Sequence, residues 1–390
     1  MGTVDFVFSN PGHHAAMMVP VVRELAARGR RCRLISLAEL RGFTTPALDL
    51  PRVDVIRAVP GGLRKSPSAG ASLGKADSPK RRAIQTAAWR LALGPRLRWL
   101  LRDTDVVVVP NDAAFPYAQL AAGLRARAVP FVLLQEGIRF PLPGVAVEAA
   151  YGRGGAAAVC CWGAASAEHF TATGVPPVRL CVTGNPRYDE LTVDRWRAAG
   201  AQLLRDHGLA GPPLVYLSNP IDDQGFCTTA DKMALFERFL AEAAPALPAG
   251  TPVVVKLHLR EDVAAFRAAA ARSPMAGRVH VLADAPLFAV LAAARAAVVL
   301  ASTVGLEALV FGVPLGVLAV PGAGHVFEYV SGGAAVGLEL GALAGGLGAL
   351  LDGGAPPAPR VAAFVERHLA HRGQAAQRVA DCIDAVERTR

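Results

Sequence analysis

The sequence lacks the cysteine patterns by which metal sites and disulfide frameworks are recognised. Its six cysteines include the adjacent pair Cys160–Cys161, but no Cys-x-x-Cys and no histidine–cysteine spacing of a metal site. The N-terminus enters an apolar strand at Val4–Ser9 without the basic, apolar and small-residue order of a secretory signal. We therefore expect a cytoplasmic protein with reduced thiols and with neither a metal ion nor a resident cofactor.

A membrane-spanning segment is also missing, although Ala296–Val320 is apolar and carries a single charge, Glu307. A spanning helix would bury that carboxylate and place Gly312–Pro314 in its middle, where proline breaks the hydrogen-bond ladder. A buried strand, a polar turn at Ser302–Thr303, a short helix and a second buried strand explain the same residues without that cost. We predict this strand–helix–strand arrangement.

Acidic residues are outnumbered, 32 against 41 basic ones, and aromatic residues make up only 6%. Because few aromatic residues alternate with the arginines, nucleic acid is not an expected partner. The positive excess instead suits an anionic ligand or surface, and the basic region 62–102 is a candidate for peripheral membrane contact. Its Gly/Ser/Pro-rich part, 61–82, can be a mobile loop that closes over an anionic substrate or a solvated excursion.

The pattern of strand, glycine turn, helix and strand occurs twice along the chain. It opens the sequence and restarts at Leu214–Leu217, after the glycine–proline segment Gly211–Pro213. This order is typical of doubly wound α/β domains with parallel sheets. Single helices are expected over Ile84–Leu101 and Val361–Arg388. The predicted divisions are a first domain at 1–188, a connecting helix and linker at 189–212, a second domain at 213–358, and a terminal helix at 359–390 that packs back toward the first domain.

Polar residues follow several predicted strands, at the edge where doubly wound domains bind their ligands. Asn10–His14 ends the first strand, and Asn111–Asp112 and Gln135–Arg139 end two others. Ser302–Gly305 leads a strand into a helix, so free N–H groups and the positive end of the helix dipole predict an anion site there. Glu307, one turn further, could reach a ribose hydroxyl. The alternative is an ordinary turn capped by serine or threonine.

Several of these segments resemble the GT-B superfamily. Gly12-His13-His14 with the later Leu25–Gly29 resembles the N-terminal segment of inverting glycosyltransferases, in which that histidine is the base. Pro252–Arg260 and Ser302–Ala308 resemble the half that binds the donor. The resemblance implies two Rossmann-like domains facing across a cleft, with the acceptor bound by the first and a nucleotide sugar by the second.

Two related GT-B families share parts of this pattern. Glycerophosphotransferases of teichoic-acid synthesis have a segment like Gly184–Asp189. UDP-GlcNAc 2-epimerases have segments similar to Asn111-Asp112 and Gln135–Arg139, but Gln135 stands where the epimerase has its catalytic glutamate. The epimerase loop His-Arg-Arg is replaced by Ser218-Asn219-Pro220. Because an epimerase must remove a proton from a sugar carbon, these replacements favour a transferase.

We therefore predict an inverting, metal-independent glycosyltransferase of polysaccharide or natural-product biosynthesis. Its donor would be a nucleotide sugar, UDP-linked in preference to GDP-, CDP-, CMP- or dTDP-linked, and its acceptor a hydroxyl or amine. The alternatives are a CDP-glycerol-type phosphotransferase, a 2-epimerase-like enzyme and a non-catalytic nucleotide-sugar-binding subunit. His13, mostly neutral at pH 7 and orientable by Asp112, is the first candidate base. His14, Asp112 and Glu136 are the other candidates for that role.

The remaining candidate residues bind substrates. Asn185 and Arg187 lie at the predicted domain junction and can alternatively act only in the hinge. In the second domain, backbone amides and cationic side chains would stabilise the departing phosphate in place of a metal ion. The acceptor-side candidates are Gly12, His14, Gln135, Arg139, Asn185 and Arg187, and the donor-side candidates are Ser218, Asn219, His258, Arg260, Ser302, Thr303, Val304, Gly305, Glu307 and His325.

Overall fold

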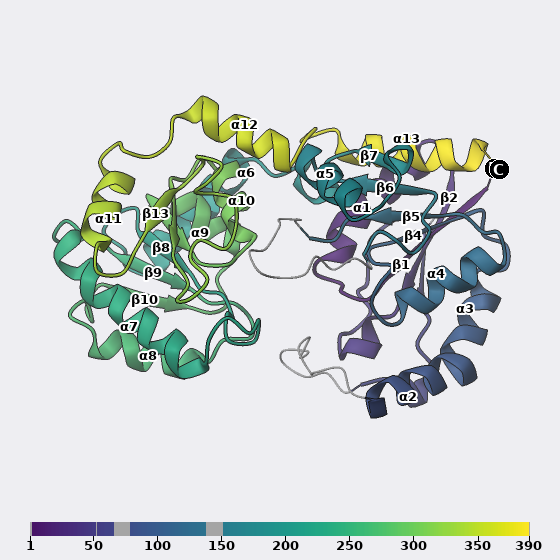
Figure 1. Ribbon diagram of the computed structural model, residues 1–390, viewed down its shortest axis with the longest axis horizontal. Helices are drawn as coiled ribbons and strands as arrows, with labels where there is room; N and C mark the ends of the chain where they lie inside the picture. The colour runs from purple at the N-terminus through teal and green to yellow at the C-terminus, as the bar shows by residue number, and fades with distance from the viewer. Residues whose placement is uncertain (1, 52, 66–78, 138–150, 390) are drawn as a thin grey trace. The chain divides into compact units, whose positions relative to one another are not determined.

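The computed structural model describes residues 2–51, 53–65, 79–137 and 151–389. These residues divide into two compact units, whose segments can be followed by their colours in Figure 1. The first unit holds the described residues up to Glu190 and those from Glu366 onward, and the second holds Leu191–Val365. The boundary on the return of the chain falls inside helix α12, Ala358–His368.

In the described part of the first unit, seven parallel strands form one sheet in the order β3-β2-β1-β4-β5-β6-β7. The central strands are short and buried on both faces, as the run of four valines in β4 illustrates. Such uninterrupted apolar runs are typical of parallel sheets covered by helices. The strands are β1 Thr3–Phe8, β2 Arg31–Ser36, β3 Asp54–Arg57, β4 Val106–Val109, β5 Phe131–Leu134, β6 Ala158–Cys161 and β7 Leu180–Val182.

Helices cover this sheet and close its core. Helix α1, His14–Ala27, buries Met17, Met18 and Leu25 against it. The last helix, α13 (Ala375–Arg388), packs on α1 and β6, so the C-terminal segment is part of the first unit. Figure 1 shows α13 in yellow beside these elements. The other α-helices described here are α2 Pro79–Ala88, α3 Gly94–Leu100, α4 Tyr117–Ala126 and α5 Ala164–Ala172.

Among the described residues of the second unit, six parallel strands form a sheet in the order β10-β9-β8-β11-β12-β13. Its core is rich in aromatic rings, and Tyr216 lies 5.2 and 5.0 Å from Phe236 and Phe239 between ring centroids. The strands are β8 Leu214–Leu217, β9 Val253–Lys256, β10 Val279–Leu282, β11 Ala296–Val299, β12 Leu315–Leu318 and β13 Val336–Leu338. The helices are α6 Val193–Asp206, α7 Thr229–Ala246, α8 Val263–Arg272, α9 Leu287–Ala293, α10 Val304–Val310 and α11 Leu343–Leu351.

Each sheet reverses its strand order at one place. In the first unit the reversal lies between β1 and β4, and in the second between β8 and β11. Connections leave these neighbouring strands in opposite directions, so a crevice forms beyond their carboxyl ends. The residues at those ends are Asn10–His14 and Pro110–Asp112 in the first unit, and Ser218–Asn219 and Leu300–Thr303 in the second.

The structure has the predicted strand–helix–strand at Ala296–Val320, formed by β11, α10 and β12. None of the helices in the described residues combines the length and the apolar character that crossing a bilayer requires. The predicted connecting helix is α6, which packs on α9 within the second unit. The predicted loop 61–82 falls largely on 66–78, outside the described residues.

The predicted helix over Ile84–Leu101 lies in one uninterrupted helical segment, which contains α2, a π-helical turn at Trp89–Leu93 and α3. The π-helical turn is explained by Pro95, which cannot donate to the α-helical ladder. The predicted single helix Val361–Arg388 is wrong. Val361–Arg388 is divided into α12 and α13. Between them His371 and Gly373 have φ of 54° and 86°, which ends an α-helix.

The packing of the C-terminal segment leads to a test of stability. Gly184→Ala is expected to lower the free energy of unfolding by about 3 kcal/mol, because its φ is +82° and the new Cβ would lie 2.3 Å from the carbonyl oxygen of Ala370. Gly174 also has a positive φ, +91°, but open space around it, so Gly174→Ala should cost only about 1 kcal/mol. Urea unfolding followed by tryptophan fluorescence measures both. Equal losses would contradict the packing of Ala370 on Gly184.

Candidate active site

The carboxylate of Glu136 lies at the centre of the polar residues beyond the first sheet. It follows β5, and it receives hydrogen bonds from residues beyond two other strands. His14 Nε2 is 2.9 Å from one carboxylate oxygen, and Asn111 Nδ2 is 2.6 Å from the other. Tyr151 helps to fix this position, because its hydroxyl accepts the Glu136 backbone N–H at 3.0 Å and donates to the carbonyl of Pro110 at 3.1 Å.

His14 is a positioning residue for this carboxylate. Its Nδ1 accepts the backbone N–H groups of Ser9 and Asn10, both at 3.3 Å. The ring proton of the neutral form therefore lies on Nε2, which donates it to Glu136. The His14 side chain is buried. Both of its nitrogens are thus occupied within the protein, which favours orientation of Glu136 over direct contact with a substrate.

His13 lies beside the same carboxylate at the start of α1. Its Nε2 contacts the backbone carbonyl of Glu136, and its Nδ1 lies 3.2 Å from a guanidinium nitrogen of Arg187. Burial lowers the pKa of His13 from 6.5 to about 4, and the positive charge of Arg187 acts in the same direction. The imidazole is therefore neutral at pH 7, with Nδ1 accepting from Arg187.

Glu136 remains ionised at neutral pH although it is largely buried. Burial by itself would raise its pKa, but hydrogen bonds from His14 and Asn111 and the nearby charge of Arg41 outweigh burial and lower it. A quarter of the side chain is exposed. An ionised, oriented and accessible carboxylate of this kind can accept a proton from a substrate hydroxyl.

Two other predicted residues of this unit, Asp112 and Asn185, hold backbone in place. Both oxygens of Asp112 accept backbone N–H groups at 2.7 Å, from Gly152 and Gly154, which favours an anchoring role over orientation of His13. Asn185 accepts the backbone N–H of Arg187 at 3.0 Å and so caps the turn Pro186–Tyr188 that carries this arginine.

Gln135 is fully buried, which disfavours the predicted contact with substrate. Its amide oxygen accepts the backbone N–H of Trp162, and its amide nitrogen donates to Gly137 and Ser166. Gly12 is exposed in the turn before α1, where its N–H donates to Asn10. Arg139 lies outside the described residues.

In the second unit, Ser218 and His258 lie beyond the neighbouring strands β8 and β9. The Ser218 hydroxyl accepts the backbone N–H of His258 at 2.9 Å, and His258 Nδ1 accepts that of Arg260 at 3.2 Å. Burial lowers the pKa of His258, and the charges of Arg260 and Lys256 act in the same direction, so its ring is a neutral Nε2–H donor. Arg260 forms an ion pair with Asp223 at 3.0 Å. Asn219 is buried beside this turn, and its amide lies 3.4 Å from that of Gln224.

The turn between β11 and α10 is held by Tyr329, which no pattern in the sequence singles out. The tyrosine hydroxyl accepts the backbone N–H of Leu306 at 3.0 Å and donates to the carbonyl of Ser302 at 3.2 Å. The Ser302 hydroxyl accepts the N–H of Val304 at 3.3 Å, and the Ser302 carbonyl accepts that of Gly305 at 3.4 Å, so two amides of the predicted anion site are already bonded. Thr303 stands at the start of α10 without a side-chain cap. No local sequence signal links Tyr329 to a turn so far upstream.

The positions of the last two donor-side candidates, Glu307 and His325, are less suited to contact with a nucleotide sugar. Glu307 is buried, which disfavours the predicted contact with a ribose hydroxyl. His325 Nε2 lies 3.5 Å from a carboxylate oxygen of Glu339. Within the described ranges no group of three or more histidine, cysteine or acidic side chains is arranged to hold a metal ion. That the reaction needs no metal stays a prediction.

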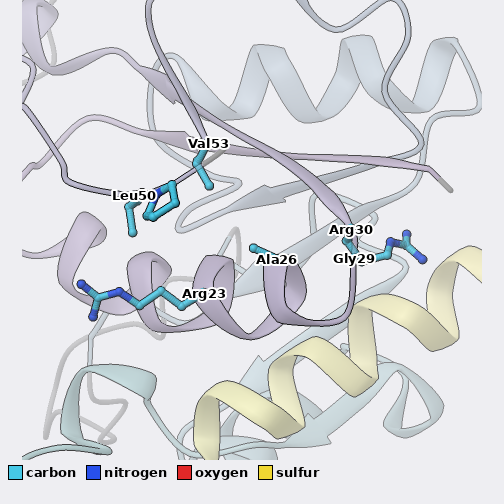
Figure 2. A pocket seen from close by; sticks show the side chains of 7 residues that line it. Arg23, Ala26, Gly29, Arg30, Leu50 and Val53 are labelled. Atoms are coloured by element: carbon cyan, nitrogen blue, oxygen red, sulfur yellow. The ribbon is translucent and has the colours of Figure 1, made fainter.

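A hollow of about 490 Å³ in the first unit lies away from these strand ends (Figure 2). It is bordered by α1, the turn that leads into β2, and the segment before β3, and therefore lies toward the amino ends of the strands. Figure 2 shows Arg23 and Arg30 at its two sides. Arg30 forms an ion pair with Glu387 at 2.5 Å. This hollow is not part of the candidate site.

Each unit is a doubly wound α/β domain, and two such domains in one chain are typical of the GT-B fold. Solved structures with this fold are similar to the chain. No protein-family model matches the sequence, and no curated protein matches it. A Listeria monocytogenes protein described as a UDP-N-acetylglucosamine 2-epimerase is similar over 100% of this chain and 97% of its own, with a TM-score of 0.65 and 16% identity.

Two further structures extend the comparison. HepE from Anabaena, in complex with UDP and glucose, has a TM-score of 0.53 and 14% identity, over 100% of this chain and 98% of its own. A glycosyltransferase from Rickettsia africae has a TM-score of 0.52 and 9% identity, over 100% and 96%. At these identities the likeness establishes the fold alone, and it confirms the predicted GT-B fold class.

The environment of His13 can be tested by NMR titration of the histidine rings. We expect the ring to stay neutral until the pH approaches about 4. Arg187→Gln should raise the pKa of His13, because it removes a positive charge that disfavours the imidazolium ion. Arg179→Gln, an exposed change elsewhere in the first unit, should leave it unchanged. A His13 that titrates near 6.5 in the unmodified protein would contradict its burial.

Proposed function

We propose that the protein is an enzyme that uses a nucleotide sugar, with UDP as the nucleotide. The GT-B fold supports this proposal, since HepE, which shares the fold, has UDP and glucose bound. The polar residues beyond β8, β9 and β11 give the second unit the groups that a nucleoside diphosphate requires: N–H donors, hydroxyls and the cationic Arg260. In the division of roles that the GT-B resemblance implies, this unit binds the donor.

Within this class we propose glycosyl transfer to an acceptor hydroxyl or amine. The observation that carries the proposal is the ionised carboxylate of Glu136, fixed by His14 and Asn111 beside the pair His13–Arg187. Transfer needs one base, which takes the acceptor proton as the acceptor oxygen or nitrogen attacks the anomeric carbon and UDP departs. Direct displacement of this kind inverts the configuration at that carbon.

Glu136 is a better candidate for the base than His13, the first choice from the sequence. Both ring nitrogens of His13 contact protein groups, whereas the Glu136 carboxylate keeps unused lone pairs and partial exposure. We assign His14 and Asn111 as positioning residues. On the donor side, Arg260, His258 and the hydroxyls of Ser302 and Thr303 would stabilise the departing diphosphate.

A 2-epimerase is the second candidate, because the Listeria protein described as one shares the fold with a TM-score of 0.65. The burial of Gln135 weighs against it, since this amide stands where the resemblance to epimerases places a catalytic glutamate. The two activities differ in one assay. An epimerase converts UDP-N-acetylglucosamine to its 2-epimer without an acceptor, whereas a transferase releases UDP only as the sugar is transferred or hydrolysed.

Glu136→Gln is expected to lower kcat by a factor of roughly 100 to 10,000, because the amide cannot accept the acceptor proton. The measurement is UDP release from UDP-glucose or UDP-N-acetylglucosamine in the presence of mixed sugar and alcohol acceptors. Glu168→Gln is the matched control, since this exposed carboxylate of the same unit pairs with Arg367. Full activity of Glu136→Gln with loss in His13→Gln would return the role of base to His13.

Binding of UDP should depend on the turn at Ser302–Gly305. In Gly305→Ala the added Cβ would lie 2.9 Å from the ring of Tyr329, so the turn must shift, and we expect UDP to bind at least tenfold more weakly. Gly345→Ala in α11 is the control, because its Cβ would meet open space. Isothermal titration with UDP, CDP and GDP compares the nucleotides. Unchanged UDP affinity in Gly305→Ala would place the nucleotide elsewhere.

A further inference from the structure

The surface formed by α2, the π-helical turn and α3, residues 79–102, carries charge of one sign. It contains seven basic residues and no acidic residue. Most of them are exposed, and the group lies on helices rather than at the strand ends of the candidate active site. We call residues 79–102 the α2–α3 surface. Its basic residues are Lys80, Arg81, Arg82, Arg90, Arg96, Arg98 and Arg102.

Large apolar side chains are exposed among these charges. Ile84 is 61% exposed, Leu91 82% and Trp99 57%. They are spaced seven and eight residues apart, about two helical turns each, so they lie on one side of the helical segment. An exposed apolar row bordered by charge is typical of an interaction surface.

The opposite side of the same segment is fixed in the core of the first unit. Leu93, Leu97 and Leu101 are buried and pack with the residues around β4 and α4. This packing anchors the segment, so the exposed row is held in a constant orientation. Little conformational entropy is therefore lost when the surface binds a partner.

A hollow of about 640 Å³ adjoins the row, between α3 and α4. The Arg102 guanidinium lies over the ring of Trp99, 5.0 Å from its centroid, and forms an ion pair with Asp103 at 3.1 Å. Guanidinium groups beside indole rings can hold an anionic group that is joined to an apolar one. The residues that line the hollow and matter here are Trp89, Arg90, Arg98, Trp99, Arg102 and Arg127.

We propose that the α2–α3 surface docks the protein on a membrane of anionic phospholipids. Arg90 and Arg98 bind lipid phosphates, Ile84 and Leu91 enter the acyl region, and Trp99 lies at the interface between them. This combination of a basic face with an apolar row is what an interfacial helix requires. The proposal is independent of the proposed glycosyl transfer, since none of these residues belongs to the candidate active site.

Charge and side-chain type favour lipid over other partners. A second copy of the chain bound through the same face would bring seven basic residues against seven like charges. A nucleic acid would match the charge, but it has no use for the aliphatic side chains of Ile84 and Leu91, which neither stack on bases nor contact phosphate. Acyl chains and phosphates together match both features.

Vesicle flotation of the full chain tests the proposal. We expect binding to mixed phosphatidylcholine and phosphatidylglycerol vesicles, much weaker binding to phosphatidylcholine alone, and weakening by salt. Arg90→Gln/Arg98→Gln should bind about 25-fold more weakly, about fivefold for each charge removed. Arg179→Gln/Arg378→Gln removes the same charge from exposed positions elsewhere in the first unit and should bind as the unmodified protein does.

A second pair of variants tests the apolar row. Ile84→Ser/Leu91→Ser should reduce vesicle binding at least tenfold, whereas Val178→Ser, also at a highly exposed position, should not. UDP release from soluble substrates should be unchanged in all these variants, which separates this proposal from the catalytic one. Equal vesicle binding by Arg90→Gln/Arg98→Gln and the unmodified protein would overturn it. So would binding of RNA or self-association through this surface without binding to vesicles.

Discussion

The hydrogen bond between His14 and Glu136 is the interaction on which the first unit's polar centre depends. It joins the first residue of α1, the helix that follows β1, to the segment after β5, and Asn111, after β4, binds the same carboxylate. A largely buried carboxylate is costly unless donors surround it. Here the donors follow β1 and β4 while the carboxylate follows β5, so the charge is stable only when these three strands are aligned. The fold thus creates the conditions under which Glu136 is ionised.

The second unit follows the same principle with different residues. Its turn after β11 is held by the hydroxyl of Tyr329, and the segment after β9 is held by Ser218 and by the ring of His258. In each case a side chain stabilises backbone beyond a parallel strand. The strand ends are therefore defined before any ligand arrives, and preorganisation lowers the entropic cost of binding.

Much of the fold could be predicted from the sequence, because short buried strands and the helices between them leave a local pattern of apolar residues. The same pattern placed His13, Glu136 and Ser218 at strand ends. The partners of these residues could not be predicted, since the pairing of Glu136 with Asn111 and the contact of Tyr329 with Ser302 join distant segments. Gln135 shows most clearly what a local sequence pattern fails to predict. Its position beyond a strand suggested contact with substrate, yet its amide is used by Trp162, which no local pattern indicates.

The return of the chain at Glu366 makes the second unit an insertion within the first. Its Leu191–Val365 segment is continuous, whereas α13 must reach α1 and β6 before the first unit is complete. During synthesis on the ribosome, the second unit can therefore fold before α13, the last helix of the first unit, has been synthesised. Loss of the final residues would then harm the half of the protein that is synthesised first, because the parts of α1 and β6 against which α13 packs would stay uncovered.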